Sequence, residues 1–533
     1  MNVRVFVAAA LIGALSLPFA AEERINSDLN SRIREEGMQQ SQLMRTLHFL
    51  TDVYGPRLTG SPSLKAAGEW VVKTMEGWGM KNARLEPWDF GHPGWTNDLA
   101  WGAITSPVKD SLVLEVLAWT PGTKGIVHGK AVNIVIPEQP TADELGAYLG
   151  TVKSKVRGAI VMVGKPRVVP VNITPAPKRN TDEDVKARYD PNNPNAGQRG
   201  RGRGRGQQEP RPGALPAREL AQQIDQFLVD NGALVRVNDA GREHGQIIAF
   251  DNRTYDITKA VPTVVVRNED YGRIARILDD GVPVELEFNI VNRTYPEGRT
   301  AYNTIGEIPG TDKKDEVVML GGHLDSWHSA TGATDNAIGC SIMLEAVRIL
   351  MKLGVQPRRT IRVALWSGEE EGILGSQAYV KEHFGSFEAP KPEYNKLVAY
   401  LNIDTGTGQL RGASVFGPAP AAATLREILA PFQDLGIYGA STSSSRVVAG
   451  TDSTAFNNAG LPGISFQQDP IEYNTHTHHT SLDTYERVIE ADVKKAAVIV
   501  ASTIYHLSMR EEMLARFTAA EMPAPPAPRV SGQ

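Results

Sequence analysis

The chain has 533 residues, of which 41% are hydrophobic and 22% are charged, and its formal net charge is −5. This composition is typical of a globular protein, and the small negative charge argues against a general binder of nucleic acids or anionic membranes. Cys340 is the only cysteine, which excludes an intramolecular disulfide and a thiolate-rich zinc finger.

The N-terminal segment has the pattern of a secretory signal peptide. One arginine precedes an apolar run over residues 5–19, and two alanines follow it. The run is short for a membrane span, so we expect residues 1–21 to be removed on export. An uncleaved anchor is the alternative. The mature protein is then expected to be periplasmic or secreted.

Helical periodicity predicts that residues 27–115 form the N-terminal part of the main domain. Leu43, Leu47 and Leu50 recur at helical spacing. The turn-rich stretch GPRLTGSPS breaks this pattern, and LKAAGEWVVKTMEGWGM resumes a helix that ends at a glycine.

Short β-branched segments such as AVNIVI, GAIVMVG and PTVVVRN predict a separate β-rich domain over residues 116–290. Residues 191–213 interrupt it with Arg-Gly repeats that cannot bury apolar surface, so we expect a disordered loop there. Such repeats also occur in RNA-binding tails. No aromatic residue stands among them for base stacking, which favours a solvated insertion.

Apolar strands alternate with helices over residues 296–515. The strand candidates are VVMLGGH, TIRVALWSG, KLVAYLNID and GISFQQD. Uniformly apolar strands that alternate with helices predict an α/β fold, with a largely parallel sheet sandwiched by helices. The proline-rich residues 516–533 are expected to be a disordered tail.

Side chains that could bind a metal follow several of these strands. They are His323, the run Glu369, Glu370 and Glu371, and Asp404, with Asp335 and the cluster THTHHTSLDT completing the set. Sites in open α/β sheets lie beyond the carboxyl ends of the strands, so we expect these residues to lie together. A site of His, Asp and Glu suits zinc, with manganese or cobalt as alternatives.

The motifs GGHLDSW, GATDN, LWSGEEEGILGS, NIDTG and THHTSLDT resemble the co-catalytic zinc peptidases. This family includes secreted bacterial aminopeptidases, glutamate carboxypeptidase II and plasma glutamate carboxypeptidase. HLDSW and PRRTIRVALWSGEEEG are most similar to its carboxypeptidase Q branch. The resemblance implies that the β-rich domain is an insertion like the protease-associated domain, and that the protein forms a homodimer.

Carried onto this sequence, the resemblance implies two zinc ions per chain. Asp335 would bridge them, His323 and Asp404 would complete one, and Glu370 and His479 the other. Such a pair of ions clamps a water and lowers its pKa toward about 7.

Three further roles are implied for residues around the ions. Glu369 would be the general base that takes the proton of the water and passes it to the leaving amine. Asp325 would hold the ring of His323. Tyr473 is a candidate donor to the tetrahedral oxyanion, although a core or rim tyrosine is an equal alternative.

Other polar residues near the motifs have competing interpretations. Glu371 is interpreted as an outward residue or as one behind the ligands. His478 neighbours His479, and only the four-residue spacing to Asp483 selects His479. We interpret His476 and His328 as polar lining, Asp452 as a contact for a substrate ammonium or a helix cap, and Cys340 as a packed core residue.

The leading hypothesis is a secreted di-zinc exopeptidase that hydrolyses short peptides or dipeptides, acting as an aminopeptidase or a carboxypeptidase Q-like dipeptidase. Its partner is then a peptide, not a nucleic acid, nor a membrane once the signal is removed. A catalytically inactive, receptor-like binding protein on the same fold is the alternative. An RNA-associated protein acting through the Arg-Gly loop is a third hypothesis.

Overall fold

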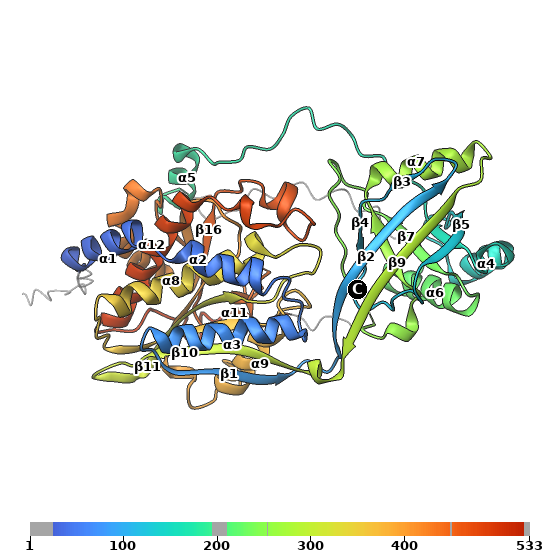
Figure 1. Ribbon diagram of the computed structural model, residues 1–533. Coiled ribbons are helices and arrows are strands. Elements are labelled where there is room, and N and C mark those ends of the chain that lie inside the picture. Colours follow the sequence, from blue (N-terminus) through green and yellow to red (C-terminus); the bar gives the residue numbers. More distant parts are fainter. Residues whose placement is uncertain (1–24, 194–210, 253, 448–449, 527–533) are drawn as a thin grey trace, which may run out of the picture.

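The computed structural model describes residues 25–193, 211–252, 254–447 and 450–526, which form two lobes (Figure 1). The expected signal peptide lies outside the described residues, and so do residues 194–210 of the Arg-Gly loop. None of the helices in the described part of the chain is both long enough and apolar enough to cross a membrane.

The larger lobe is built on an eight-stranded mixed sheet of order β1-β10-β12-β11-β13-β16-β14-β15. Its strands are β1 (Lys81–Asp89), β10 (Thr300–Ile308), β11 (Lys313–His323), β12 (Arg359–Trp366), β13 (Leu397–Asn402), β14 (Leu410–Phe416), β15 (Ala440–Ser443) and β16 (Gly463–Gln468). The central strands β12, β11, β13 and β16 are parallel, whereas β1, β10 and β14 join them by antiparallel pairs. The predicted mixed, largely parallel sheet is confirmed.

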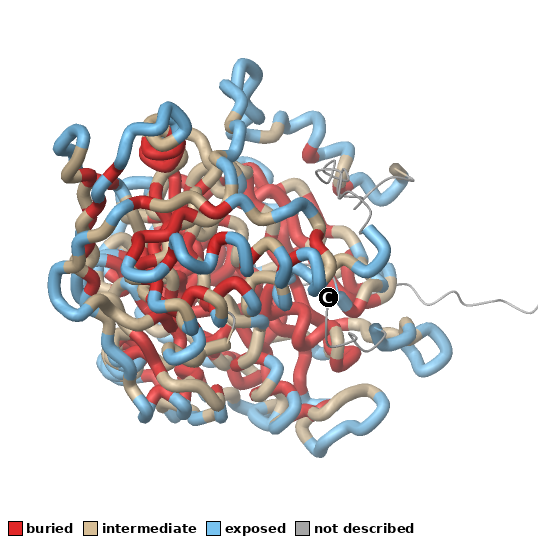
Figure 2. Tube along the Cα trace, turned by 90° about the vertical axis from the view of Figure 1, so that its right-hand side faces the viewer, coloured by how far each residue is buried: buried red, intermediate tan, exposed pale blue. Residues whose placement is uncertain are grey.

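Helices cover both faces of this sheet. One face carries α1 (Ser27–Gln39), α2 (Leu43–His48), α3 (Pro62–Gly77), α8 (Ile338–Lys352), α10 (Ala419–Leu429) and α12 (Glu490–Met509), and the other carries α9 (Leu374–His383) and α11 (Ser453–Asn458). Helix α8 is apolar nearly all round because it packs between the sheet and three other helices. Figure 2 shows the buried residues gathered inside the molecule under exposed loops and helix faces.

The smaller lobe has its own eight-stranded sheet, of order β3-β2-β9-β5-β6-β7-β8-β4. Its strands are β2 (Gly94–Ser106), β3 (Asp110–Ser111), β4 (Leu114–Val116), β5 (Val127–Ile134), β6 (Ile160–Val163), β7 (Val235–Asp239), β8 (Thr263–Val266) and β9 (Glu285–Tyr295). Strands β5, β6, β7 and β8 are parallel. Helices α4 (Ala142–Val156), α6 (Ala217–Asp230) and α7 (Asn268–Asp279) accompany them.

Two expectations about this lobe need correction. Its sheet begins at Gly94 and ends at Tyr295, so the boundary at 116 leaves out β2 and β3, and the boundary at 290 falls within β9. The lobe is also α/β rather than simply β-rich. A capping box that joins Thr141 and Glu144 starts α4, and this local signal was not used in the sequence interpretation.

The C-terminal segment also differs from its prediction. Arg516 donates to the carbonyls of Tyr394 and Leu397, and the Phe517 ring lies 5.2 Å from the ring of Phe416. The expectation of a disordered tail from residue 516 is therefore wrong for these two residues. Their side chains find partners on the larger lobe, although the segment that follows is rich in proline.

The two lobes are joined where β1 leads to β2 and β9 leads to β10, and three glycines meet at this junction. A Cβ on Gly94 would lie 2.0 Å from the carbonyl oxygen of Gly60, and one on Gly298 would lie 2.3 Å from the nitrogen of Gly94. Both contacts are with backbone, which cannot move aside cheaply. The close approach of three chain segments therefore requires glycine.

We expect Gly94→Ala to lower the free energy of unfolding by about 1–3 kcal/mol, because the added methyl overpacks this junction. Urea denaturation measures the change. Gly146→Ala in α4 is the control, since a Cβ there meets nothing within 4 Å and alanine is favoured in helices by up to about 1 kcal/mol. A Gly94→Ala protein as stable as the wild type would contradict the argument.

Candidate metal centre

Four parallel strands of the larger lobe bring the predicted ligands to one edge of the sheet. His323 is the last residue of β11, Glu370 follows β12, and Asp404 follows β13. Asp335 lies in a π-helical turn (η4, Ala333–Ala337) that leads into α8, and His479 lies in the loop beyond β16. Because parallel strands end on the same side, residues 156 positions apart become neighbours.

One cluster forms around His323. Its Nε2 lies 3.2 Å from Asp335 Oδ1 and 3.4 Å from Asp404 Oδ1. One ligand atom from each of the three residues falls within 4.8 Å of the others, a spacing at which the three could hold a single metal ion.

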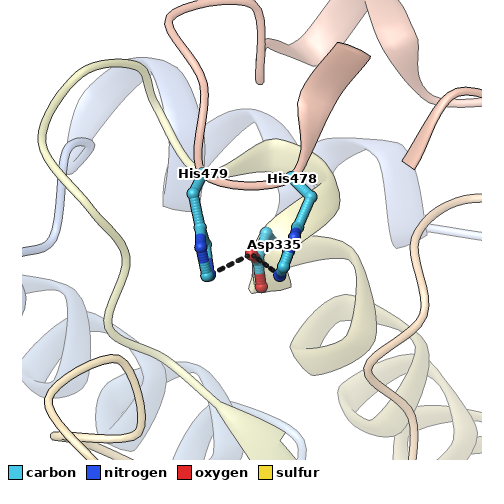
Figure 3. Close-up of side chains that lie close together, drawn as sticks. All are labelled: Asp335, His478 and His479. Carbon is cyan, nitrogen blue, oxygen red and sulfur yellow. Dashed lines mark ion pairs between the residues drawn. The ribbon is translucent and has the colours of Figure 1, made fainter. Parts of the chain in front are cut away.

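A second cluster forms around the other oxygen of Asp335. Asp335 Oδ2 lies 3.3 Å from His479 Nε2 and 3.7 Å from His478 Nε2 (Figure 3). The same nitrogen of His479 lies 2.9 Å from Glu370 Oε2. Asp335 thus directs one carboxylate oxygen to each cluster, which is the geometry of a bridging ligand.

The polar atoms in these clusters fit bound cations. His323 Nε2 and Asp335 Oδ2 are buried and have no hydrogen-bond partner among the described residues. An unpaired buried polar atom is costly, and a metal ion would satisfy both. The donor set of imidazole and carboxylate, without thiolate, suits divalent metals such as zinc.

The pKa shifts of the buried carboxylates also favour bound cations at this site. Burial would raise the pKa of Asp335, but the neighbouring imidazoles of His323 and His479 hold it below its usual range. Burial raises the pKa of Glu369 and of Glu370 well above the ordinary value, and nearby carboxylates add to the rise. So many buried carboxylates repel one another unless cations lie between them.

Glu369, the predicted base, lies at the edge of the first cluster. Its Oε2 is 3.9 Å from His323 Nε2, and its side chain remains 11% exposed. Glu371, the third residue of the run, has both carboxylate oxygens buried, so the outward interpretation of this residue is wrong.

Asp325 supports the ligands differently from its implied role. The ring nitrogen His323 Nδ1 lies 3.1 Å from the backbone carbonyl of Asp325 and 3.8 Å from its carboxylate. That carboxylate instead accepts hydrogen bonds from Thr59 Oγ1 and from the backbone N–H of Glu370, each at 3.2 Å. Asp325 therefore fixes the backbone of one ligand and the ring of another.

Asp483 holds the turn that carries the bridging carboxylate. Its two oxygens accept hydrogen bonds from the backbone N–H groups of Thr334 at 2.6 Å and of Asp335 at 3.0 Å. Burial raises the pKa of Asp483 to about 7. The loop that carries His479 and Asp483 thus supplies one predicted ligand and positions the turn of another.

Tyr473 and Asp452 are two further candidate residues of the site. The hydroxyl of Tyr473 is 3.4 Å from Asp404 Oδ1. Asp452 is fully buried, accepts a hydrogen bond from Ser376 Oγ at 2.6 Å and makes no capping bond to α11. The cap interpretation of Asp452 is therefore wrong, and its contact with a substrate ammonium stays a prediction.

Cys340 and His328 have structural positions. The Cys340 thiol donates to the carbonyl of His323, and burial raises its pKa to about 12, which agrees with a packed core residue. His328 Nε2 lies 2.6 Å from the carbonyl of Val116 in the smaller lobe, and burial lowers its pKa to about 4. The expectation that His328 lines the site is wrong, because it joins the lobes instead.

The sequence interpretation missed two contributors. Phe250 of the smaller lobe packs its ring 5.0 Å from Trp327 and 5.4 Å from His479. Arg57 is buried and donates to the carbonyls of Leu324 and Gly332, on the loop after His323. An arginine within the turn GPRLTGSPS was the one visible signal, whereas nothing local marked Phe250.

A mixed sheet with two clusters of metal-type side chains that share one carboxylate at its edge is the arrangement expected of a metallopeptidase. Residues 303–504 match the family described as Peptidase family M28. The predicted likeness to the co-catalytic zinc peptidases is thereby confirmed.

Relatives extend the likeness over most of the chain. Carboxypeptidase Q of Rattus norvegicus is 27% identical over 484 residues, which cover 90% of this chain and 88% of the relative. A peptidase M28 precursor from Shewanella amazonensis is similar in structure, with a TM-score of 0.63, 22% identity and 92% and 98% of the two chains covered. A zinc aminopeptidase of Bacillus subtilis has a TM-score of 0.55, 16% identity and covered shares of 90% and 97%.

We expect Asp483→Asn to weaken zinc binding on the order of 10- to 100-fold. The carboxylate accepts hydrogen bonds from the backbone N–H groups of Thr334 and Asp335, whereas an amide has only one oxygen and would face one of these donors with its own NH₂ group. Competition with a chromogenic chelator measures the affinity. Asp312→Asn, in a surface ion pair with Arg358, is the control and should bind zinc as the wild type does. Equal affinities in all three proteins would exclude this role of Asp483.

Proposed function

We propose that this metallopeptidase is an exported di-zinc exopeptidase that cleaves short peptides or dipeptides. The observation that carries the proposal is the arrangement of Asp335, whose two oxygens face two separate sets of ligand atoms. Export rests on the signal-like N-terminus, and homodimer formation stays a prediction from the resemblance.

The ligands divide into two sets. His323, Asp335 and Asp404 would hold one zinc ion, and Asp335, Glu370 and His479 the other. We favour His479 over His478 because His479 Nε2 lies 2.9 Å from Glu370 and its side chain is 23% exposed, against 42% for His478. When bound, such a pair of ions supplies Lewis-acid polarisation of a carbonyl and an acidified water.

The residues around the ions would move the protons. Glu369, at the edge of the first cluster, takes a proton from the attacking water and returns it to the nitrogen of the leaving amine. The hydroxyl of Tyr473, beside Asp404, donates a hydrogen bond to the oxyanion of the tetrahedral intermediate. Asp325 keeps the His323 ring and the backbone of Glu370 in place.

One observation bears on the receptor-like alternative. A receptor-like protein on this fold is disfavoured because every one of the five ligand positions carries a metal-binding side chain and all five lie together.

We further propose that the smaller lobe is an insertion of the protease-associated type, since it interrupts the larger lobe between β1 and β10.

Glu369→Gln is expected to retain two zinc ions per chain and to slow peptide hydrolysis on the order of 10²–10⁴-fold, since the amide cannot accept the proton. Elemental analysis and single-turnover kinetics measure the two properties. Glu382→Gln, an exposed position in the same segment, is the matched control. Hydrolysis by Glu369→Gln within a few-fold of the wild type would place the base elsewhere.

Blocking one end of a dipeptide at a time reveals which terminus the enzyme requires. An aminopeptidase loses activity on N-acetylated substrates, and a carboxypeptidase loses it on C-amidated ones. Exhaustive chelation should abolish hydrolysis of the peptide substrates, and added zinc should restore it. Full activity in the metal-free protein would refute the di-zinc proposal.

A further inference from the structure

A large polar cavity lies beyond the carboxyl ends of β6, β7 and β8 of the smaller lobe. Its volume is about 1080 Å³, and Asn474 and Thr475 border it from the larger lobe. Eight of the side chains that line it are charged, and no residue of the two metal clusters is among them. Crevices at this position of a parallel sheet are common ligand sites. The cavity is separate from the metal centre, and none of the catalytic steps proposed above uses it.

Two acidic side chains at the strand ends are engaged within the smaller lobe. Asp225 Oδ1 accepts a hydrogen bond from the guanidinium of Arg236 at 2.5 Å. Asp239 accepts hydrogen bonds from the backbone N–H groups of Arg167 at 2.7 Å and of Gly241 at 2.9 Å. These carboxylates therefore hold the wall of the cavity together.

The other two acidic side chains of the cavity also have partners. Glu243 Oε2 lies 3.7 Å from the ring nitrogen Nε2 of His244, and the Asp251 carboxylate is hydrogen-bonded to Tyr255. Each of the four carboxylates that line the cavity thus has a partner in the described part of the chain.

Two basic side chains of the cavity have no such partner. Lys165 and Arg167 line it, and neither side chain makes an ion pair or a hydrogen bond within the described ranges. The stem of Arg167 lies on the turn after β7, because a Cβ on Gly241 would stand only 2.2 Å from Arg167 Cδ. Two positive charges are therefore available to a ligand in the cavity.

Gln246 adds a buried donor to the same wall. Its side chain is fully buried, and its Oε1 accepts a hydrogen bond from Arg242 Nε at 3.2 Å. A guanidinium can only donate, so this bond fixes which way the amide is turned. The amide Nε2 is left without a hydrogen-bond partner among the residues that the structure describes. An unpartnered buried donor is costly, and a carboxylate oxygen would satisfy it.

The segment that carries this donor is bonded to the loop of His479. The backbone N–H of Ser481 donates to the carbonyl of Ile247 at 2.9 Å, and the backbone N–H of Ile247 donates to Ser481 Oγ at 3.3 Å. Ile247 directly follows Gln246, and Ser481 stands two residues after His479. A ligand that binds Gln246 would therefore restrain the loop that carries a predicted zinc ligand.

We propose that this cavity is an effector site for small organic carboxylates. The carboxylate would bind Lys165, the guanidinium of Arg167 and the amide of Gln246, since these are the unpartnered donors of the cavity and a guanidinium matches the geometry of a carboxylate. The cavity is larger than the roughly 300–1,000 Å³ of most small-molecule pockets, so it has room for an organic molecule rather than a bare ion. Only the effect on zinc rests on the proposed di-zinc function.

Calorimetric titration of the zinc-loaded protein with glutarate tests the site, and glutaramide is the uncharged probe of the same size. The wild type should bind glutarate at least about tenfold more tightly than glutaramide. Lys165→Met, Arg167→Met and Gln246→Leu should each weaken glutarate binding on the order of 10- to 100-fold, the loss expected for one hydrogen bond to a charged group. The first two variants change exposed side chains, so the test does not depend on the folding of Gln246→Leu.

Lys155→Met is the matched control. Lys155 is an exposed residue at the end of α4 that does not line the cavity, so this variant should bind glutarate as the wild type does. Glutarate that bound to the zinc ions instead would bind all three cavity variants as tightly as the wild type. That outcome would overturn the inference, as would equal affinities for glutarate and glutaramide.

The effector role has its own measurement. Saturating glutarate should raise the zinc affinity of the wild type on the order of fivefold or more relative to Arg167→Met in the same buffer, a typical coupling between two sites. Competition with a chromogenic chelator measures both proteins, and the same ratio with and without glutarate would refute the effector role. Failure of the di-zinc proposal is distinguishable, because the protein would then bind glutarate and no zinc.

Discussion

Buried negative charge is the constraint around which this protein is organised. Asp335, Glu370 and Asp404 converge on two imidazoles at the edge of the sheet, and burial makes ionised carboxylates expensive there. Neutralisation by cations is the physical solution that this donor set allows. Two carboxylates hold the backbone of the predicted ligands in place. Asp325 accepts a hydrogen bond from the backbone N–H of Glu370, and Asp483 accepts one from the backbone N–H of Asp335.

The second lobe gives the centre walls that the first lobe lacks. Phe250 packs on His479, and His328 reaches across to the carbonyl of Val116, so the lobes meet at the site itself. The glycine junction sets how closely the connecting strands approach. Side chains of both lobes therefore surround the metal centre.

The parts of the centre that could be predicted follow from one regularity. Apolar strands ending in His323 or Asp404 belong to a parallel sheet, and parallel strand ends meet, so their neighbourhood could be inferred without a structure. Contacts such as Phe250 on His479 join residues more than 200 positions apart, and no local pattern encodes them. The lobe boundary at Gly94 escaped because the helical pattern before it and the strand after it were interpreted as one domain.

The single thiol of the chain has a consequence for where the protein can work. Cys340 is a fully buried residue of α8, and its S–H group donates a hydrogen bond to the backbone carbonyl of His323. It can neither cross-link two copies nor be oxidised without prior unfolding. Neither thiol oxidation nor thiol–disulfide exchange therefore acts on the folded chain through its one cysteine.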